Sequence, residues 1–125
     1  MTSEELSRQC AQIVFEKGAE DVMILDLRDL TDIADFFIIA SANSRIHLKA
    51  LTEAVEEFLD EYKVKPYHTE GLTGLSWVLV DTYDVIIHLF LPEVRRYYDI
   101  EGYWGDAPIM LISAEHEVAQ EVQSE

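Results

Sequence analysis

The chain has 125 residues, of which 49% are hydrophobic and 27% charged, as expected for one globular domain with a single core. Its 25 acidic and 9 basic side chains give a formal net charge of −16, which disfavours direct nucleic-acid binding, because that affinity depends on Lys and Arg displacing counterions from phosphates. No run approaches the roughly 18 apolar residues of a membrane span, and the N-terminus lacks the pattern of a signal peptide. A cytoplasmic protein without membrane contact is therefore expected.

The first third of the chain predicts one helix followed by two strands. Apolar residues recur at helical spacing over residues 4–17, and Gly18 follows where such a helix would end. Two apolar runs, 21–27 and 35–40, are shorter than helices of normal length and predict buried strands. The second run is apolar at nearly every position, which is typical of a central strand covered by helices on both faces.

The middle of the chain predicts a long helix and then a hairpin. Residues 41–44 supply turn and N-cap side chains, and apolar residues mark one face of a helix that extends to about Tyr62. An extended segment near 65–69 precedes two strands, 77–80 and 85–90, which are rich in β-branched and aromatic residues. The link between these two strands lacks the glycine that would adopt a positive φ without steric cost.

The last predicted helix leaves the sheet at Pro92, which suits a first helical turn but cannot donate to a strand ladder. The order helix, two strands, helix, three strands, helix predicts an α/β fold with a mixed five-stranded sheet flanked by helices. We expect one domain over residues 1–108. Residues 109–125 are then a C-terminal acidic tail that is partly disordered or helical.

Six segments of the chain carry a resemblance to a known family. They are residues 33–41, 70–72, 77–81, 84–88, 92–99 and 104–108. In order and spacing these segments resemble the Iojap-related family of ribosomal silencing factors, over roughly positions 4 to 108. Residues 1–108 are therefore expected to form a ribosomal silencing factor domain. Tyr83 and Ala42 stand where relatives commonly have glycine, and these departures bear on local turn geometry more than on function.

The resemblance implies a fold, a partner and a mechanism. The fold is related to that of nucleotidyltransferases, and the protein is expected to be a homodimer. The implied partner is the large ribosomal subunit, contacted at its ribosomal protein L fourteen. The bound factor stands where the small subunit should dock, so subunit joining is blocked and translation is repressed when nutrients are limiting.

A nucleotidyltransferase-like enzyme acting on a small molecule or nucleic acid is the alternative function. Such enzymes pair a Gly-Ser turn before a helix with carboxylates on neighbouring strands, which hold metal ions against the transferring phosphate. Here residues 41–44 lack that glycine, and residues 67–70 hold one acid rather than an Asp-x-Asp pair. Glu70, Asp81 and Asp84 are the candidate carboxylates, and we expect no catalysis. A general dimeric adaptor is the third interpretation.

The remaining chemistry-bearing residues predict neither a metal site nor a cofactor. The four histidines are His47, His68, His88 and His116. None lies at HxxxH or HExxH spacing, so helix geometry cannot direct two of them at one ion. His88 lies in an apolar strand and is expected to be a hydrogen-bonded core or interface residue. The single cysteine, Cys10, is expected to pack inside a helix face.

Aromatic and acidic residues near the hairpin are the candidate partner-binding surface. Tryptophan and tyrosine are over-represented at binding hot spots, and acidic side chains attract a basic protein. The candidate residues are Trp77, Glu70, Asp81, Asp84, Glu93, Tyr97, Tyr98 and Asp99. Trp77 is the expected anchor, because it begins a strand beside a glycine-containing loop, on the surface that the resemblance implies faces the ribosome.

Overall fold

The computed structural model describes residues 1–113 and, as backbone, residues 120–122. The helices are α1 (Ser3–Glu16), α2 (Arg45–Glu61), α3 (Pro92–Tyr98) and α4 (Ile100–Tyr103). The strands are β1 (Glu20–Asp26), β2 (Phe36–Ser41), β3 (His68–Glu70), β4 (Trp77–Asp81), β5 (Val85–Phe90), β6 (Ile109–Leu111) and β7 (Gln120–Val122). Within these residues no helix has the length and apolarity that crossing a bilayer requires.

The strands form one mixed sheet in the order β3-β4-β5-β2-β1-β6-β7. Only the central neighbours β2 and β5 are parallel among the described strands, and the other pairs are antiparallel. The predicted α/β class and the five predicted strands are confirmed, but the predicted strand count is too low. Strand β6 pairs with β1, and β7 pairs with β6. Each of these two strands has three residues, which is too short for a periodic sequence pattern to predict.

The added strands change the account of the C-terminal tail. Residues 109–111 and 120–122 are strands rather than helix or disorder. Strand β6 pairs with β1 and β7 pairs with β6, and these ladders satisfy the backbone groups of both segments. The rest of the predicted tail, 114–119 and 123–125, lies outside the described residues.

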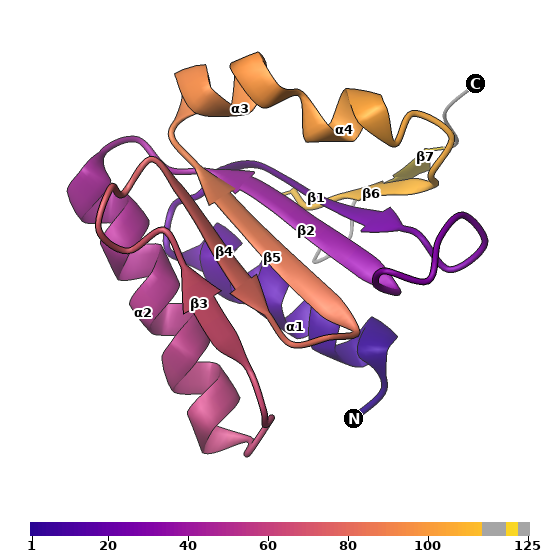
Figure 1. Ribbon diagram of the computed structural model, residues 1–125, viewed down its shortest axis with the longest axis horizontal. Helices are drawn as coiled ribbons and strands as arrows, with labels where there is room; N and C mark the ends of the chain where they lie inside the picture. Colours follow the sequence, from indigo (N-terminus) through magenta and orange to yellow (C-terminus); the bar gives the residue numbers. More distant parts are fainter. Residues whose placement is uncertain (114–119, 123–125) are drawn as a thin grey trace.

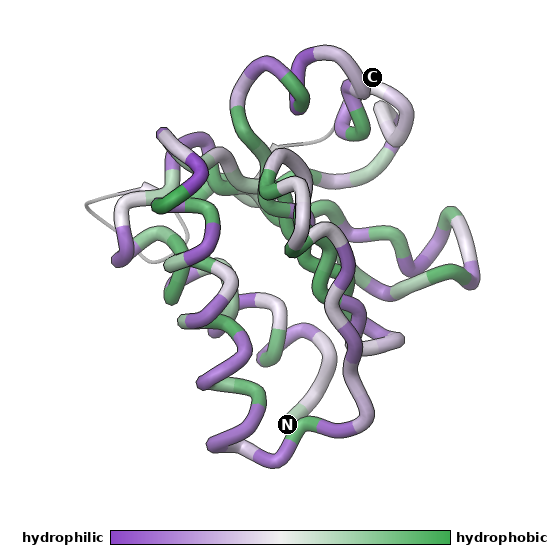
Figure 2. The backbone as a smooth tube through the Cα atoms, turned by 60° about the vertical axis from the view of Figure 1, so that its left-hand side comes forward, coloured by the Kyte–Doolittle hydropathy of each residue, from purple (hydrophilic) through white to green (hydrophobic). Residues whose placement is uncertain are grey.

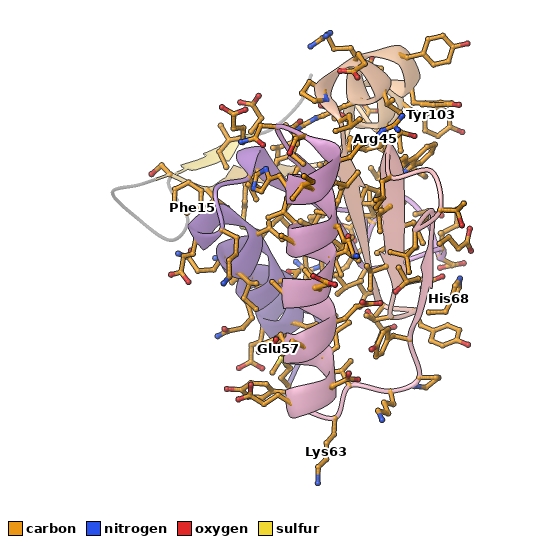
Figure 3. All side chains as sticks on the ribbon, turned by 90° about the vertical axis from the view of Figure 1, so that its left-hand side faces the viewer. Phe15, Arg45, Glu57, Lys63, His68 and Tyr103 are labelled. Atoms are coloured by element: carbon orange, nitrogen blue, oxygen red, sulfur yellow. The ribbon has the colours of Figure 1, made fainter. Side chains whose placement is uncertain are left out.

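Helices cover both faces of the sheet. Helices α1 and α2 lie on one face, and α3 and α4 cross the other at one end of the strands (Figure 1). The hydropathy colouring of Figure 2 alternates along α2 and is mostly hydrophobic in the central strands. Figure 3 shows Glu57 on the outer side of α2, whereas Tyr103 and His68 lie across the sheet from that helix.

Alternation along the central strands divides the core into two clusters. Every residue of β2 and β5 is buried, as expected for strands covered on both faces. Phe36 and Ile38 pack with the apolar stripe of α2 in the first cluster. Phe37 and Phe90 belong to the second cluster, against which residues of α3 and α4 such as Val94 pack.

The single helix predicted after Pro92 is two short helices. Asp99 separates α3 from α4 with φ of 48°, and its carboxylate accepts a hydrogen bond from the Gly102 N–H at 3.3 Å. Arg95 joins both helices to the sheet: its Nε donates to Glu101 on α4 and its Nη1 donates to Ser41 at the end of β2, both at 2.9 Å. The pair therefore lies on the sheet as one layer.

The link between β4 and β5 adopts a left-handed backbone conformation although it contains no glycine. Tyr83 has φ of 73°, in the left-handed region that favours glycine. The Asp81 carboxylate accepts a hydrogen bond from the Tyr83 N–H at 2.8 Å, and Thr82 bonds to Val85 across the turn. These hydrogen bonds compensate for the missing glycine, so the turn remains tight.

Gly71, at the end of β3, lets the chain pass close to the start of β4. Its φ is 92°, and a Cβ built on it would collide with the backbone carbonyl oxygen of Trp77. Gly74, three residues later, has open space around the corresponding position. A side chain is therefore tolerated at Gly74 and not at Gly71, although both glycines lie in the same loop.

We predict that Gly71→Ala lowers the free energy of unfolding by ~2 kcal/mol, because alanine at this φ is strained and its Cβ displaces β4. Gly74→Ala is the matched control and should change stability by less than about 0.5 kcal/mol. Urea denaturation followed by circular dichroism measures both. If the two variants are equally stable, the close approach of Gly71 to the Trp77 carbonyl does not restrict which residue can stand at position 71.

Candidate functional site

Trp77 is the centre of an aromatic cluster on the face of the sheet that α3 covers. Its half-buried indole stacks on Phe90 at a centroid distance of 5.0 Å and contacts Tyr98 of α3 at 4.8 Å. Phe90 is its directly paired neighbour on β5. The cluster therefore joins the sheet to α3 while leaving part of the indole at the surface.

His88 fixes the orientation of the indole through a hydrogen bond. Trp77 Nε1 donates a hydrogen bond to His88 Nδ1 at 3.2 Å, and His88 is 4% exposed. Because Nδ1 accepts, the neutral ring carries its hydrogen on Nε2, which has no partner within the described residues. Burial lowers the pKa of His88 to about 4, against the opposing effect of Asp81. At neutral pH the imidazole is uncharged and remains an acceptor for Trp77, so the expectation of a hydrogen-bonded core histidine is confirmed.

A shallow hollow opens beside the indole. Glu70, Gly71, Trp77 and Leu79 line it, and its volume is about 220 Å³. Leu79 and Gly71 were not predicted as site residues. The period-2 rule would have found Leu79, because residues two apart on a strand share a face, but Gly71 enters only through its contact with the Trp77 backbone. The hollow can accept one apolar side chain of a partner next to a carboxylate.

The two predicted tyrosines lie at the end of α3, next to this hollow. Tyr98 is 52% exposed and touches Trp77, whereas Tyr97 is 81% exposed and meets Tyr98 edge-on at 4.9 Å. Tyr103 on α4 is exposed to the same extent as Tyr97. Exposed aromatic rings next to a half-open indole extend the surface on which a partner can bury area.

The predicted acidic residues do not form one cluster. Glu70 borders the hollow and bonds to His68 at 2.8 Å. Glu93 is exposed on the first turn of α3, and Asp99 caps α4 next to Tyr98. The other two, Asp81 and Asp84, lie together at the turn that joins β4 to β5. The structure thus places Glu70 and Asp99 beside the aromatic cluster and separates the turn acids from it.

Two of the three carboxylates of the enzyme hypothesis, Asp81 and Asp84, are also separated from the turn that would accompany them. Ser41 pairs with Phe90, which pairs with Trp77 at the start of β4. Asp81 is at the far end of the same strand, so the 41–44 turn and the acidic hairpin turn lie at opposite ends of the sheet. Among the described residues no group of three His, Cys, Asp or Glu side chains is placed to hold a metal ion.

Comparison with known proteins agrees with this architecture. The family model described as "Ribosomal silencing factor during starvation" matches residues 1–125, which includes the C-terminal segment beyond the predicted resemblance. The ribosomal silencing factor RsfS of Bacillus subtilis is 34% identical over 109 residues, covering 87% of this chain and 92% of that protein. A mouse relative named "Mitochondrial assembly of ribosomal large subunit protein 1" is 30% identical over 92 residues, which cover 71% of this chain and 40% of the relative.

A solved structure extends the likeness to three dimensions. A crystal structure of a protein from Chromobacterium violaceum superposes with a TM-score of 0.81 at 37% identity, covering 84% of this chain and 88% of that one. Sequence and structure agree over most of the chain, and the relatives are named as regulators of the ribosome rather than as enzymes. The chain therefore belongs to the ribosomal silencing factor family.

Proposed function

We propose that this protein binds the large ribosomal subunit through ribosomal protein L fourteen and sterically blocks association with the small subunit, repressing translation under nutrient limitation. The observation that carries the proposal is the family match over residues 1–125. The name of the mouse relative also refers to a ribosomal large subunit. The protein acts by occupying a surface, without catalysis, as a cytoplasmic homodimer.

The aromatic cluster is the proposed contact surface. A hot spot needs a large, rigid side chain next to a pocket, surrounded by groups that exclude water. Trp77 is held in one orientation by His88 and Phe90, the hollow lies beside it, and Tyr98 borders it. Because the indole N–H is already bonded to His88, the binding energy comes from the ring surface rather than from a hydrogen bond to the partner.

Charge supplies the second part of the proposal. The net charge of −16 attracts a basic ribosomal protein over a distance of about a Debye length, which is ~8 Å at physiological salt. Glu70 and Glu93 are exposed on this side of the sheet, and neither carboxylate caps a turn or helix. They are therefore the acids of the predicted set that can be neutralised with least damage to the fold.

Co-sedimentation tests the function directly. Purified protein should pellet with isolated large subunits, reduce the yield of joined ribosomes in sucrose gradients, and be displaced by an excess of free L fourteen. Absence from the large-subunit pellet would contradict the proposal. Binding without any effect on joining would contradict the steric mechanism, and insensitivity to free L fourteen would contradict the partner.

We predict that Trp77→Ala weakens large-subunit binding by at least about thirtyfold, as the loss of a central aromatic anchor does. The variant loses its contacts with Phe90 and Tyr98, so a melting curve must accompany the binding measurement; truncation of a fully buried tryptophan would cost ~3–5 kcal/mol. Trp77→Phe retains a ring against both neighbours and should bind more tightly than Trp77→Ala. Tyr62→Ala removes an exposed ring beside α2, across the sheet, and should bind normally. A folded Trp77→Ala that still blocks joining would exclude the anchor role.

A further prediction concerns the acidic residues. The pair of substitutions Glu70→Gln and Glu93→Gln should slow association with the large subunit by about fivefold and reduce its dependence on salt, because steering acts mainly on the on-rate. The matched control neutralises Glu53 and Glu57 on α2. Surface plasmon resonance at low and high ionic strength separates on-rate from off-rate. Equal on-rates for the two pairs would show that the predicted acids merely solvate the surface.

A further inference from the structure

A second recess lies where the two parallel strands end. Strands β2 and β5 run side by side to Ser41 and Phe90. The chain then leaves in opposite directions: α2 packs on the first core cluster and α3 on the second. Adjacent parallel strands whose connections diverge to opposite faces leave a crevice beyond their carboxyl ends, and open α/β sheets bind small ligands there.

The crevice is present and has the size of a ligand site. Its volume is about 640 Å³, within the range of small-molecule pockets. The lining residues are Asp21, Met23, Ser41, Pro92, Arg95, Arg96, Asp99, Glu101 and Leu111. It shares no lining residue with the hollow beside Trp77, so it is a separate site.

Among the residues that the structure describes, Arg95 contributes one unbonded donor nitrogen to the lining of this crevice. The residue is 7% exposed, and its Nε and Nη1 are held by Glu101 and Ser41. Within the described residues no hydrogen bond engages its Nη2. A guanidinium fixed by two partners loses little conformational entropy when its remaining donors bind a carboxylate. Arg96 adds a second, exposed guanidinium on the same helix.

The opposite wall carries negative charge. Asp21 is the second residue of β1 and is exposed, and its carboxylate has no hydrogen bond or ion pair within the described residues. Met23, Pro92 and Leu111 add apolar side chains to the same lining. A ligand that is only anionic would meet the acids of the wall and the field of −16, and one that is only cationic would leave Arg95 unused. The lining therefore favours a molecule with both charges and a short apolar chain.

We propose that this crevice binds a zwitterionic α-amino acid with an apolar side chain. Its carboxylate contacts Arg95 Nη2 and Arg96, its ammonium group faces Asp21, and its side chain lies against Met23 and Leu111. The crevice does not depend on ribosome binding, so this proposal is tested independently of the function proposed above.

The test is a titration of the isolated, isotopically labelled protein with L-leucine, followed by ¹⁵N–¹H correlation spectra. The amide signals of Met23, Ser41 and Leu111 should shift with a dissociation constant of about 1 mM, the order expected for so few ligand atoms. The probes 4-methylpentanoate and 3-methylbutylamine lack the ammonium group and the carboxylate, respectively. Each should bind at least tenfold more weakly than leucine.

Two exposed substitutions assign the charges without disturbing the buried arginine. Asp21→Asn should weaken leucine at least fivefold and leave 4-methylpentanoate unchanged; asparagine also tolerates the positive φ of 51° at this position. Arg96→Gln should weaken both carboxylate probes and leave the amine unchanged. Asp84→Asn, at the hairpin turn, is the control and should have no effect.

Three outcomes would overturn the proposal. The first is an absence of shifts up to about 20 mM leucine, twentyfold above the expected constant. The second is equal affinity for leucine and 4-methylpentanoate, which would make the crevice a carboxylate site only. The third is a set of shifts that leaves Ser41 and Leu111 unmoved, which would place the binding elsewhere.

Discussion

The parallel pairing of β2 with β5 is the contact on which the rest of the structure depends. All six residues of each strand are buried and paired in register from Phe36–Val85 to Ser41–Phe90. Two such strands need cover on both faces, and the helices that follow them supply it, α2 on one side and α3 with α4 on the other. The crevice beyond Ser41 results from this arrangement.

Arg95 connects this crevice with the region around Trp77. It ties α3 to the end of β2 and to α4, and the last residue of α3, Tyr98, rests on Trp77. The position of the aromatic cluster is therefore coupled to the buried guanidinium through one short helix. The Trp77 side of this layer is stabilised by ring stacking and by the hydrogen bond to a neutral His88, so neither charge nor metal is needed to orient the indole.

The candidate site could be predicted from sequence only in part. The sequence predicts Trp77 and Tyr98 as partner-binding aromatic residues near the hairpin, and the structure brings them into contact. The sequence could not show which acidic residues lie near Trp77. Residues four apart along β4 lie at opposite ends of the strand. Asp81 thus belongs to the turn, whereas Glu70, which looks distant in sequence, borders the same hollow as Trp77.

The sequence by itself determined the order of the predicted elements, the burial of the central strand β2 and the family. These properties follow from the local periodicity of hydrophobic residues and from short sequence motifs, neither of which requires knowledge of distant contacts. Only the tertiary structure decided the added strands β6 and β7, the division of the last helix at Asp99, and the crevice beyond Ser41. The helix divides at Asp99 because this residue adopts a positive φ, which a helical pattern does not predict. The added strands and the crevice depend on contacts between residues far apart in the chain, such as Leu25 with Ile109 or Ser41 with Arg95. Their energies arise only when folding brings the partners together.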